Sequence, residues 1–493
     1  MSESKTLADL GLTAQAGRRA NITGLAVDSR AVEPGNLFAA LPGTNVHGGE
    51  FIKYALRRGA AAILTDTRGA AIAFEELSQS DAALITAEDP HQTLAYTCAL
   101  WFGAQPEVIV AVTGTNGKTS VSVFARQIWE ALGQRAVNIG TTGVEGAVQA
   151  PLAHTTPDPI TLHKILRQVA DAGVTHAAME ASSHGLAQRR LDGVRLAVAG
   201  FTNFSQDHLD YHADFAEYFA AKAGLFERVL SEDGIAVINM DDARGPDMAA
   251  IAQGRGQEVI RVGRGAQADL RLLGQRFTAT GQEIRLDWNG GIHQMHLDLL
   301  GGFQAENVLL AAGLCIAAGA DPERVFEALP GMQTVRGRMQ LAATRQNGAA
   351  VFVDFAHTSD AIATALKAMR PHVMGRLIAI IGAGGDRDPG KRPLMGKAAA
   401  EHADLVIVSD DNPRSEDPGT IRAAVMAGCP EATEVGDRAE AILRGVDMLG
   451  PGDALLITGK GHESGQIVGD DVLPFDDSEQ ASVAVVALDG GLA

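Results

Sequence analysis

The sequence has little of what marks secreted, zinc-binding or membrane-embedded proteins. Its 493 residues include only three cysteines, Cys98, Cys315 and Cys429, which lie far apart. That spacing offers neither a disulfide framework nor a zinc knuckle, and it predicts a reducing compartment. No apolar run approaches the roughly 20 residues that span a bilayer, and the first residues lack a basic segment followed by an apolar stretch. We therefore expect a cytoplasmic protein with no signal peptide and no membrane insertion.

Positive charge is also scarce. The 60 acidic residues outnumber the 41 basic ones, which gives a formal net charge of -19. Because a polyanion would be repelled, nucleic acids and anionic membranes are excluded as main partners. Small anionic substrates are not excluded, since a few arginines in a cleft can outweigh the global field. A hydrophobic content of 46% is ordinary for a packed globular protein, and the length suits about three domains.

Short apolar runs alternate with alanine-rich helical patterns along most of the chain. Near-continuous apolar strands separated by helices predict parallel, doubly wound α/β domains. The segment from about Gln267 to Leu299 alternates in polarity and could form an antiparallel addition. Polar breaks at 88–91 and 331–337 are candidate domain boundaries. The apolar runs are VIVAVT (108–113), THAAME (175–180), IAVINM (235–240), VFVDF (351–355), LIAIIG (377–382), LVIVSD (405–410) and ALLITG (454–459).

The first of these runs leads directly into a glycine-rich segment, GTNGKTS (114–120), which is followed by an amphipathic helical pattern. This order of strand, loop and helix is what a phosphate-binding loop requires, because the loop N–H groups and the helix N-terminus attract phosphate. Lys118 would bridge terminal phosphates, and Thr119 would offer a hydroxyl to Mg²⁺. The spacing departs from GxxxxGK[ST], since Val112 stands where the first glycine belongs. We nevertheless predict ATP binding here.

Two further segments carry candidate metal ligands. Glu180 ends the run THAAME and precedes the polar loop ASSHG, a position at which open α/β sheets bind nucleotides. The segment 202–212, TNFSQDHLDYH, holds Asp207, His208, Asp210 and His212. Because Mg²⁺ prefers oxygen ligands, Glu180 is the better candidate, and a polar loop without metal explains the second segment equally well.

Lys222 lies in the middle of the apolar stripe of a predicted helix over 214–230. A lysine on such a face must extend to the edge, pair, or lose its charge. A neutral amine can capture CO₂ as a carbamate, which would place a carboxylate on a long arm. The pattern alone favours a lysine that reaches the edge of the stripe.

The ordered series of motifs resembles the Mur ligases, three-domain ATP-dependent amino-acid ligases of peptidoglycan precursor synthesis. It covers nearly the whole chain. In chain order the motifs are DSR (28–30), PGNLFAALPG (34–43), GTNGKT, HTTPD (154–158), EASSHGL (180–186) with Gln188 and Arg190, DHLDYH, AAKAGLF (220–226), VRGRM (335–339), DFAHTSDA (354–361), GAGGDRDPGKRPLMG (382–396), DNPR (411–414) and GKGHE (459–463).

The resemblance implies an α/β fold of three domains. A small N-terminal α/β domain over 1–88 would bind the uridine nucleotide, and a central parallel-sheet domain of the P-loop ATPase type over 89–334 would bind ATP. A Rossmann-like domain over 335–493 would bind the amino acid. Catalysis is expected from Lys118, Glu180, His208 and Lys222, with Lys222 carbamylated by CO₂ and Thr119, Glu180 and His208 on Mg²⁺. The expected ATP residues are Gly114, Thr115, Asn116, Gly117, Lys118, Thr119, Ser120, Asn307, Arg338, Asp354 and His357.

The resemblance also assigns the second substrate, UDP-N-acetylmuramoyl-L-alanyl-D-glutamate. Its expected contacts are Val27, Ser29, Thr44, Asn45, Val46, Thr155, Thr156, Ser182, Gln188 and Arg190. The chain departs from the family pattern at His47, Phe355 and Ser359, where Asp, Tyr and Pro are usual, and in an RGR context around Arg338. None of these departures falls on the phosphate or metal residues.

The C-terminal strands end in polar loops that should meet at one crevice, because parallel strands have their carboxyl ends at the same edge. Polar strand-end loops without a ligand are the plain alternative. An arginine offers a planar fork for a carboxylate and repels an ammonium group. Arg414 therefore favours meso-diaminopimelate over lysine, which lacks the distal carboxylate. The expected contacts of this ligand are Arg387, Asp411, Asn412, Pro413, Arg414, Gly459 and Glu463.

These expectations combine into an amide-forming ligase that works through an acyl phosphate. The glutamate carboxylate would attack the γ-phosphate of ATP, and the amine of diaminopimelate would then displace phosphate. We expect a monomer. Three rivals stay open: the same reaction with L-lysine, a relative such as folylpolyglutamate synthetase, and a P-loop nucleotide switch without ligase chemistry.

Overall fold

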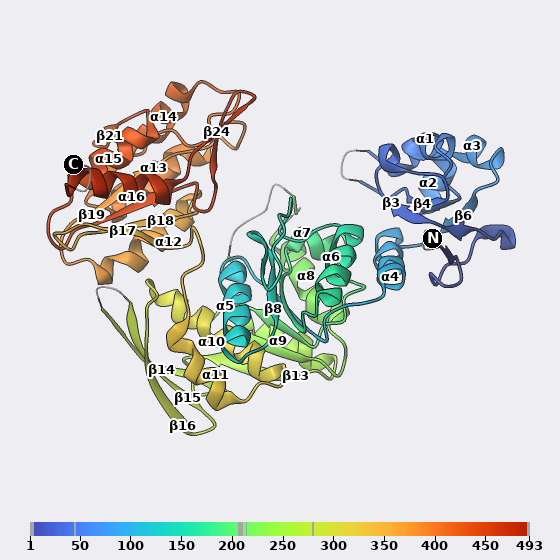
Figure 1. Ribbon diagram of the computed structural model, residues 1–493, viewed down its shortest axis with the longest axis horizontal. Coiled ribbons are helices and arrows are strands. Elements are labelled where there is room, and N and C mark those ends of the chain that lie inside the picture. The colour runs from blue at the N-terminus through green and yellow to red at the C-terminus, as the bar shows by residue number, and fades with distance from the viewer. Residues whose placement is uncertain (1–3, 44–45, 206–210, 213, 279–280, 491–493) are drawn as a thin grey trace. The chain divides into compact units, whose positions relative to one another are not determined.

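The computed structural model describes residues 4–43, 46–205, 211–212, 214–278 and 281–490. The chain divides into two compact units, and the predicted α/β class is confirmed in both (Figure 1). The first unit comprises Met1–Asp269 and Leu310–Val325, and the second comprises Leu270–Leu309 and Phe326–Ala493.

The N-terminal part of the first unit is built on a parallel sheet of order β3-β4-β5-β6. Leu37, Leu64 and Ile85 of this sheet share a core with Leu94 and Cys98 of the helix that follows it, α4. The strands are β1 (Lys5–Thr6), β2 (Asn21–Ile22), β3 (Gly24–Ala26), β4 (Asn36–Ala39), β5 (Ala62–Thr65) and β6 (Ala83–Thr86), and the α-helices are α1 (Ile52–Arg57), α2 (Thr67–Ile72), α3 (Phe74–Ser78) and α4 (Pro90–Phe102).

The central sheet of the same unit has the order β13-β12-β11-β7-β10-β8-β9, parallel except for the edge strand β9. Strand β7 has β10 on one side and β11 on the other, so the chain direction across the sheet reverses there. Ligands bind at such a switch point. The strands are β7 (Val108–Thr113), β8 (Ala136–Gly140), β9 (Gly143–Gly146), β10 (His176–Glu180), β11 (Val198–Phe201), β12 (Ile235–Asn239) and β13 (Glu258–Gly263).

Apolar strands of this kind are stable only when both faces are covered. One face packs against Leu162 and Leu166 of α6 and against Phe219 and Ala223 of α8. The helices of this part are α5 (Lys118–Ala131), α6 (Pro159–Asp171), α7 (Ser183–Ala187), α8 (Phe215–Gly224) and α9 (Gly245–Gly254). Helix α10 (Gly302–Ala317) contributes its second half to this unit, and α11 (Pro322–Ala328) follows it.

The second unit begins with the antiparallel meander β14 (Leu270–Phe277), β15 (Gln282–Trp288) and β16 (Gly291–Leu297). The predicted antiparallel addition over Gln267–Leu299 is thereby confirmed. The C-terminal sheet has the order β17-β18-β22-β19-β20-β21, with only β17 antiparallel. Its strands are β17 (Gln340–Thr344), β18 (Ala350–Asp354), β19 (Leu377–Ile381), β20 (Leu405–Val408), β21 (Thr433–Glu434) and β22 (Ala454–Thr458).

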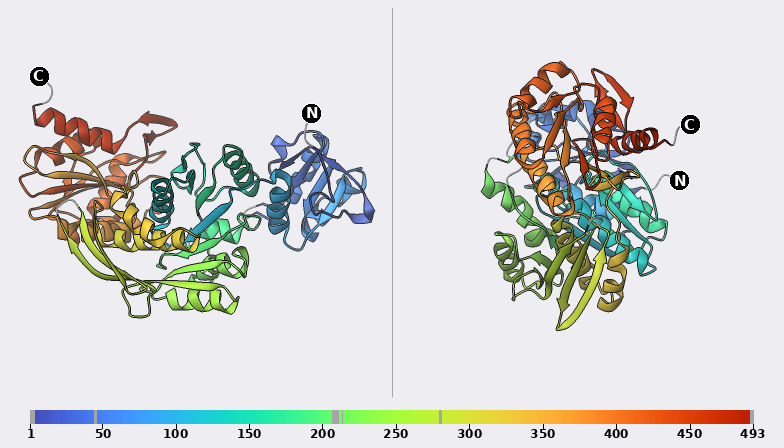
Figure 2. Two further views of the ribbon diagram at one scale, coloured as in Figure 1. Left: turned by 60° about the horizontal axis from the view of Figure 1, so that its bottom comes forward. Right: turned by 90° about the vertical axis from the view of Figure 1, so that its left-hand side faces the viewer.

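Helices cover both faces of the C-terminal sheet (Figure 2). Alternate residues of each strand enter different cores: Ile381 packs with α12 to α14, whereas its neighbour Ile380 packs with α15 and α16. The remaining elements are α12 (Ser359–Met369), α13 (Lys391–His402), α14 (Pro418–Met426), α15 (Arg438–Asp447), β23 (Gly465–Val468), β24 (Asp471–Pro474) and α16 (Asp477–Leu488).

All seven apolar runs predicted as strands are strands of these sheets. The predicted domain limits at 88/89 and 334/335 stay predictions. Across the described part of the chain, no helix combines the length and apolarity needed to cross a membrane.

Candidate active site

The phosphate loop connects β7 to α5 at the switch point of the central sheet. Gly114 has φ +148° and Gly117 has φ +87°, backbone conformations that residues with a Cβ rarely adopt. A Cβ on Gly114 would also lie 1.8 Å from Oγ1 of Thr202. Nζ of Lys118 folds back over the loop and donates to the carbonyl oxygens of Gly114 and Thr115, both at 2.9 Å. The positively charged ammonium group of Lys118 is therefore held by the backbone of the loop itself.

Glu180 ends β10, and its buried carboxylate lies beside this loop. Oγ1 of Thr119 donates to its Oε2 at 3.0 Å. Thr141, just after β8, donates its backbone N–H to Oε1 at 2.7 Å and its hydroxyl to Oε2 at 3.2 Å. A carboxylate and a hydroxyl are the oxygen donors that Mg²⁺ prefers, so Thr119 and Glu180 fit that ion. The third predicted ligand, His208, lies outside the described residues.

Lys222 does not reach the edge of its helix stripe. Its side chain is only 1% exposed, and Nζ donates to the carbonyl oxygen of Gly114 at 2.8 Å. Nζ also lies 4.4 Å from the ring centroid of Tyr218, whose hydroxyl is 3.2 Å from Oγ1 of Thr115. Helix α8 thus delivers a buried amine to the backbone of the phosphate loop, 108 residues away in sequence.

Residues after β11 fix the other side of the loop, and no sequence motif marked them as functional. Oδ1 of Asn203 accepts from the N–H of Asn116 at 2.9 Å, and its Nδ2 donates to the carbonyl oxygen of the same residue at 3.1 Å. The hydroxyl of Thr202 donates to that carbonyl oxygen at 2.6 Å. Their only sequence signal was a place in the TNF segment at the end of an apolar run.

Five predicted contacts of the uridine substrate in the central domain gather near Glu180. The hydroxyl of Thr156 donates to the carbonyl oxygen of Glu180 at 2.9 Å and accepts from the N–H of Ser182 at 3.0 Å. The hydroxyl of Thr155 lies 3.1 Å from that of Thr141. The half-buried Arg190 donates to the carbonyl oxygen of Thr156 at 2.5 Å and, from NH2, to Oε1 of Gln188 at 2.7 Å.

Burial lowers the pKa of Arg190, but it stays far above neutral because an arginine guanidinium remains charged in proteins. This group therefore presents a fixed positive charge beside hydroxyl and amide groups. Such a surface suits an anionic substrate with many hydroxyl groups.

The other predicted uridine contacts lie on the N-terminal part. Val27 and Val46 are exposed, whereas Thr44 and Asn45 are outside the described residues. Ser29 follows Asp28, and the side chain of Arg30 holds the pKa of the Asp28 carboxyl down to about 2.

Both ring nitrogens of His47, a departure from the family pattern, contact other groups of the N-terminal part. Its Nδ1 accepts from the N–H of Gly49 at 2.9 Å, and its Nε2 lies 3.1 Å from Oδ1 of Asp66.

In the second unit, three of the four further residues predicted for ATP meet at the end of β18. The buried carboxylate of Asp354 accepts from the N–H groups of Met339 at 2.7 Å and Ala356 at 2.8 Å. Burial raises its pKa, while the charge of Arg338 and these two N–H groups act in the opposite direction. The guanidinium of Arg338 lies 4.8 Å from the ring centroid of Phe355.

His357 follows Asp354 in the same loop, and its carbonyl oxygen accepts from Nζ of Lys391 at 3.2 Å. Lys391 was not predicted as a site residue, and burial lowers its pKa. Asn307, the fourth residue predicted for ATP, is buried on α10 and donates to Oε1 of Gln304 at 3.1 Å.

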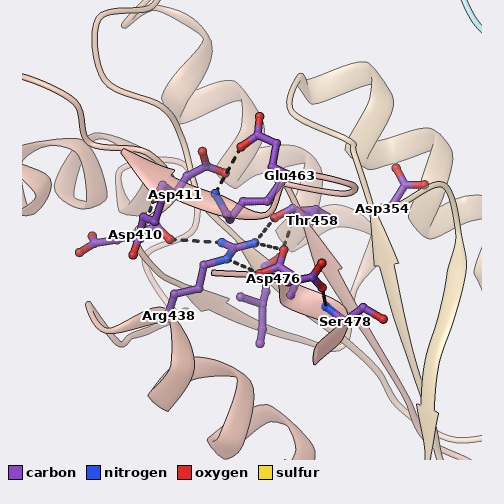
Figure 3. A network of polar contacts seen from close by, with 12 residues as sticks. Asp354, Asp410, Asp411, Arg438, Thr458, Glu463, Asp476 and Ser478 are labelled. Carbon is purple, nitrogen blue, oxygen red and sulfur yellow. Dashed lines mark hydrogen bonds and ion pairs between the residues drawn. The ribbon is translucent and has the colours of Figure 1, made fainter. Parts of the chain in front are cut away.

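The loops after β20 and β22 carry most of the residues predicted to contact the amino acid. Nδ2 of Asn412 donates to Oε2 of Glu463 at 2.8 Å. The fully buried Lys460 donates from Nζ to Oδ1 of Asn412 at 3.1 Å and to Oε2 of Glu463 at 3.2 Å. Figure 3 shows Asp411 and Glu463 close to one another at this edge of the sheet. Lys460 was missed as a candidate although it lies inside the GKGHE motif.

The arginines of the pocket lie on neighbouring loops. Arg414 adopts a left-handed conformation with φ +51°, and its NH1 donates to the carbonyl oxygen of Gly385 at 2.9 Å. Arg387 is exposed and donates to the carbonyl oxygen of Asp386 at 3.1 Å. The carbonyl oxygen of Pro413 faces Gly385, where a Cβ would lie 1.9 Å from it. The guanidinium of Arg414 and the carboxylate of Glu463 therefore belong to adjoining loops.

Comparison with known proteins accounts for this combination of sites. Residues 112–315 match the Mur ligase middle domain, 337–461 match the Mur ligase glutamate ligase domain, and 21–101 match the catalytic domain of the Mur ligase family. A UDP-N-acetylmuramoyl-L-alanyl-D-glutamate–2,6-diaminopimelate ligase of Caulobacter vibrioides is 48% identical over 475 residues, which cover 95% of this chain and 96% of that protein. The chain belongs to the Mur ligase family.

Two further proteins of the same name extend the comparison. The Mur ligase of Bradyrhizobium diazoefficiens is 47% identical over 94% of this chain and 95% of its own length. A solved structure of such a ligase superposes with a TM-score of 0.73 at 33% identity and covers 99% of each chain. The resemblance read from the motifs is thereby confirmed, together with the Mur ligase architecture.

Proposed function

We propose that this Mur ligase joins meso-2,6-diaminopimelate to UDP-N-acetylmuramoyl-L-alanyl-D-glutamate with hydrolysis of ATP, in the synthesis of peptidoglycan precursors. The observation that carries the proposal is the mixed charge of the C-terminal loops, where NH1 of Arg414 lies 3.5 Å from the carbonyl oxygen of Asn412 and Nδ2 of Asn412 donates to Glu463. An amino acid with one more carboxylate than lysine needs such a pocket. A cytoplasmic monomer suffices for this reaction, since every proposed group lies on one chain.

ATP would bind with its phosphates on the loop of Gly114 to Ser120. Phosphate oxygens would draw Nζ of Lys118 away from the carbonyl oxygens that it now contacts. Thr119 and Glu180 would hold Mg²⁺, which would neutralise charge on the phosphates. Arg338, Asp354, His357 and Asn307 are the proposed contacts of the rest of the nucleotide.

The reaction would proceed in two displacements. A carboxylate oxygen of the D-glutamate residue attacks the γ-phosphorus, ADP leaves, and an acyl phosphate forms. The neutral amine of diaminopimelate then attacks the acyl carbon, phosphate leaves with the C–O bond electrons, and the nitrogen loses a proton as the amide forms. The chain supplies positioning and positive charge, and no side chain needs to become covalently bonded to substrate.

We also propose that Lys222 carries a carbamate in the working enzyme. Its buried Nζ contacts the phosphate loop, where a carboxylate at the end of the side chain would reach the phosphates and their metal. The amine would add to CO₂ and release one proton. Enzyme equilibrated with ¹³C-bicarbonate should show a carbamate carbon signal by NMR that is absent from Lys222→Met; equal signals in both proteins would refute this assignment.

The test of the main proposal is phosphate release with ATP and UDP-N-acetylmuramoyl-L-alanyl-D-glutamate, with meso-diaminopimelate and L-lysine compared at equal concentration. We expect release with diaminopimelate and little with lysine, because an arginine left without its carboxylate disfavours the wrong ligand. Arg414→Ala should lower kcat/KM for diaminopimelate by on the order of 10²-fold or more.

Arg444→Ala provides the matched control, because Arg444 pairs on the surface with Glu440 of the same helix. It should leave both activities unchanged. Lysine-dependent release that survives Arg414→Ala would instead assign the pocket to lysine. Nucleotide binding without release for either amino acid would favour a nucleotide switch.

A further inference from the structure

A fully buried ion pair lies beneath the amino-acid pocket, and the proposed function does not use it. Arg438 begins α15 and Asp477 begins α16, and the side chains of both are 0% exposed. Nε of Arg438 donates to Oδ1 of Asp477, and NH2 donates to Oδ2, each at 2.7 Å. This is a fork-on-fork pair, the geometry that holds a guanidinium and a carboxylate most rigidly.

The rest of the guanidinium contacts the backbone of the two pocket loops. NH1 donates to the carbonyl oxygen of Asp410 at 3.2 Å, and NH2 donates to that of Thr458 at 2.9 Å. These two residues directly precede Asp411 and Gly459, the first predicted substrate contacts in the loops after β20 and β22. Figure 3 shows Arg438 between Asp410 and Thr458, with the dashed contacts running to both.

The two loops meet at a short separation. A Cβ on Gly459 would lie 2.3 Å from Oδ2 of Asp411, and Gly459 has φ +112°. The carboxylate of Asp411 therefore packs directly against the backbone of the other loop. Arg438 contacts the residue before each of them and so bridges the two loops.

The start of α16, which carries Asp477, is itself held in place by the residue before it. Asp476 caps α16 by accepting from the N–H groups of Ser478 at 2.9 Å and Glu479 at 3.1 Å. Arg336, two residues before the proposed ATP residue Arg338, donates to Oδ2 of Asp476 at 2.7 Å. The start of α16 thus connects the segment of Arg336 and Arg338, which precedes β17, with Arg438 and the loops that it contacts.

We infer that Arg438 and Asp477 are positioning residues for the amino-acid substrate: the pair joins the carbonyl groups of Asp410 and Thr458 and so sets the spacing of the loops that carry Asp411, Asn412 and Glu463. The inference rests on the proposed function of those loops. Neither residue would touch the substrate, because both are buried below it.

Stability alone does not account for a charged pair at this place. Removing two charges from water is costly, and apolar side chains of similar volume often replace a buried pair without loss of stability. Apolar side chains cannot donate to the two carbonyl groups, however. Burial acts to lower the pKa of Arg438, but the Asp477 carboxylate more than compensates and raises it, so the donors stay in place at any working pH.

The experiment separates spacing from stability in the full-length enzyme. The variants are Arg438→Lys, Asp477→Asn and the apolar double variant Arg438→Met with Asp477→Leu. For each, KM for diaminopimelate, KM for ATP, kcat and the melting temperature are measured. The matched control is Arg345→Met with Asp489→Leu, because Arg345 and Asp489 form a partly buried pair at 2.8 Å at the other end of α16.

We expect KM for diaminopimelate to rise in the double variant by on the order of tenfold to a hundredfold, as a loop displacement near 1 Å would cause. KM for ATP should stay within about twofold, and the melting temperature should stay within about 5 °C of the wild type. Arg438→Lys, which keeps the charge but loses the fork, should also raise KM for diaminopimelate. The control should raise neither KM.

Unchanged KM for diaminopimelate in the folded variants, or an equal rise in the control, would overturn the inference. So would unfolding of every pair variant while the control stays folded, since the pair would then serve stability. The proposed function is judged separately, by diaminopimelate-dependent phosphate release of the wild-type enzyme.

Discussion

The phosphate-loop site and the amino-acid pocket treat buried charge in opposite ways. Among the described residues, the contacts of the Glu180 carboxylate are with neutral groups, the hydroxyls of Thr119 and Thr141 and one N–H. In the pocket, Lys460 lies 3.2 Å from Glu463, and Arg438 is paired with Asp477 below them. The phosphate-loop site thus holds a carboxylate on neutral donors, whereas the carboxylates of Glu463 and Asp477 are paired with a lysine and an arginine of the same chain.

The difference indicates what each region needs from its ligand. A buried carboxylate held only by neutral donors is costly, and a bound cation would relieve that cost. The contacts of Glu180 are therefore in keeping with the proposed binding of Mg²⁺ and nucleotide at the phosphate-loop site. Charged groups of the C-terminal loops are paired within the protein itself, which suits the fixed geometry proposed for amino-acid binding. Each of the following predictions tests one side of this contrast.

The largest effect is expected from Glu180→Gln. The amide keeps the shape and can still bond to the hydroxyls of Thr119 and Thr141, since hydroxyls both donate and accept. Loss of the charge should lower kcat by on the order of 10³-fold, while the free energy of unfolding changes by no more than about 1 kcal/mol. Phosphate release and denaturant unfolding in the absence of nucleotide provide the two measurements.

Glu145→Gln is the matched control, because the Glu145 carboxylate accepts from Nδ2 of Asn138 at 3.3 Å on the neighbouring strands and is assigned no role in the reaction. It should retain activity. If Glu180→Gln instead unfolded the protein and spared the activity of the folded fraction, the carboxylate would be structural, and the contrast between the two regions would fail.

Local pattern was sufficient for the α/β class, for seven of the strands and for part of the site. Apolar runs bounded by glycine and polar loops predicted these strands, because a parallel strand buried on both faces needs a nearly continuous run of apolar residues. The same pattern brought Thr119 and Glu180 to one edge, since Glu180 ends β10 and Thr119 lies at the start of α5, just beyond the end of β7. The roles of these residues stay predictions.

Contacts between distant segments were beyond that reasoning. Asn203 bonds to Asn116 across 87 residues, and Arg438 meets Asp477 across 39. Neither pair has a periodicity or spacing that marks it, because the contact exists only once the sheet order is fixed. Lys222 shows the same limit: its stripe favoured an extended lysine, yet the nearby loop supplies a carbonyl acceptor inside the core.

A second, intermediate effect is expected from adding one methyl group to either region. Gly114→Ala would place a Cβ 1.8 Å from Oγ1 of Thr202, and Gly459→Ala would place one 2.3 Å from Oδ2 of Asp411. We expect KM for ATP to rise in the first variant and KM for diaminopimelate in the second, each by on the order of tenfold to a hundredfold. Steady-state kinetics with one substrate varied at a time measures both.

Two other glycines separate collision from backbone strain. Gly133 and Gly348 have φ of +83° and +86°, and an added Cβ would meet nothing within 4 Å. Their alanine variants should lose about 1 kcal/mol of stability or more with both KM values unchanged. A rise of both KM values in Gly114→Ala and in Gly459→Ala alike would show that the two regions are not independent.

The smallest effect is expected on the pH dependence of stability. It tests whether a titratable group is also buried without a charged partner outside the phosphate-loop site. In the core of the central domain, burial lowers the pKa of His163 on α6 to about 4, and no described group hydrogen-bonds to its Nε2. The unfolded chain, with a histidine pKa near 6.5, then binds the proton more readily than the folded one. Stability should therefore fall as pH drops from about 6.5 towards 4, by about 1.4 kcal/mol at pH 5.5.

Two variants test this origin of the pH dependence. His163→Gln should unfold more easily at neutral pH but lose less stability between pH 7.5 and 5.5. His154→Gln, at an exposed position, should keep the wild-type slope of stability against pH. Parallel slopes for all three proteins would place the acid sensitivity outside this core, and the charge contrast would then be confined to the site itself.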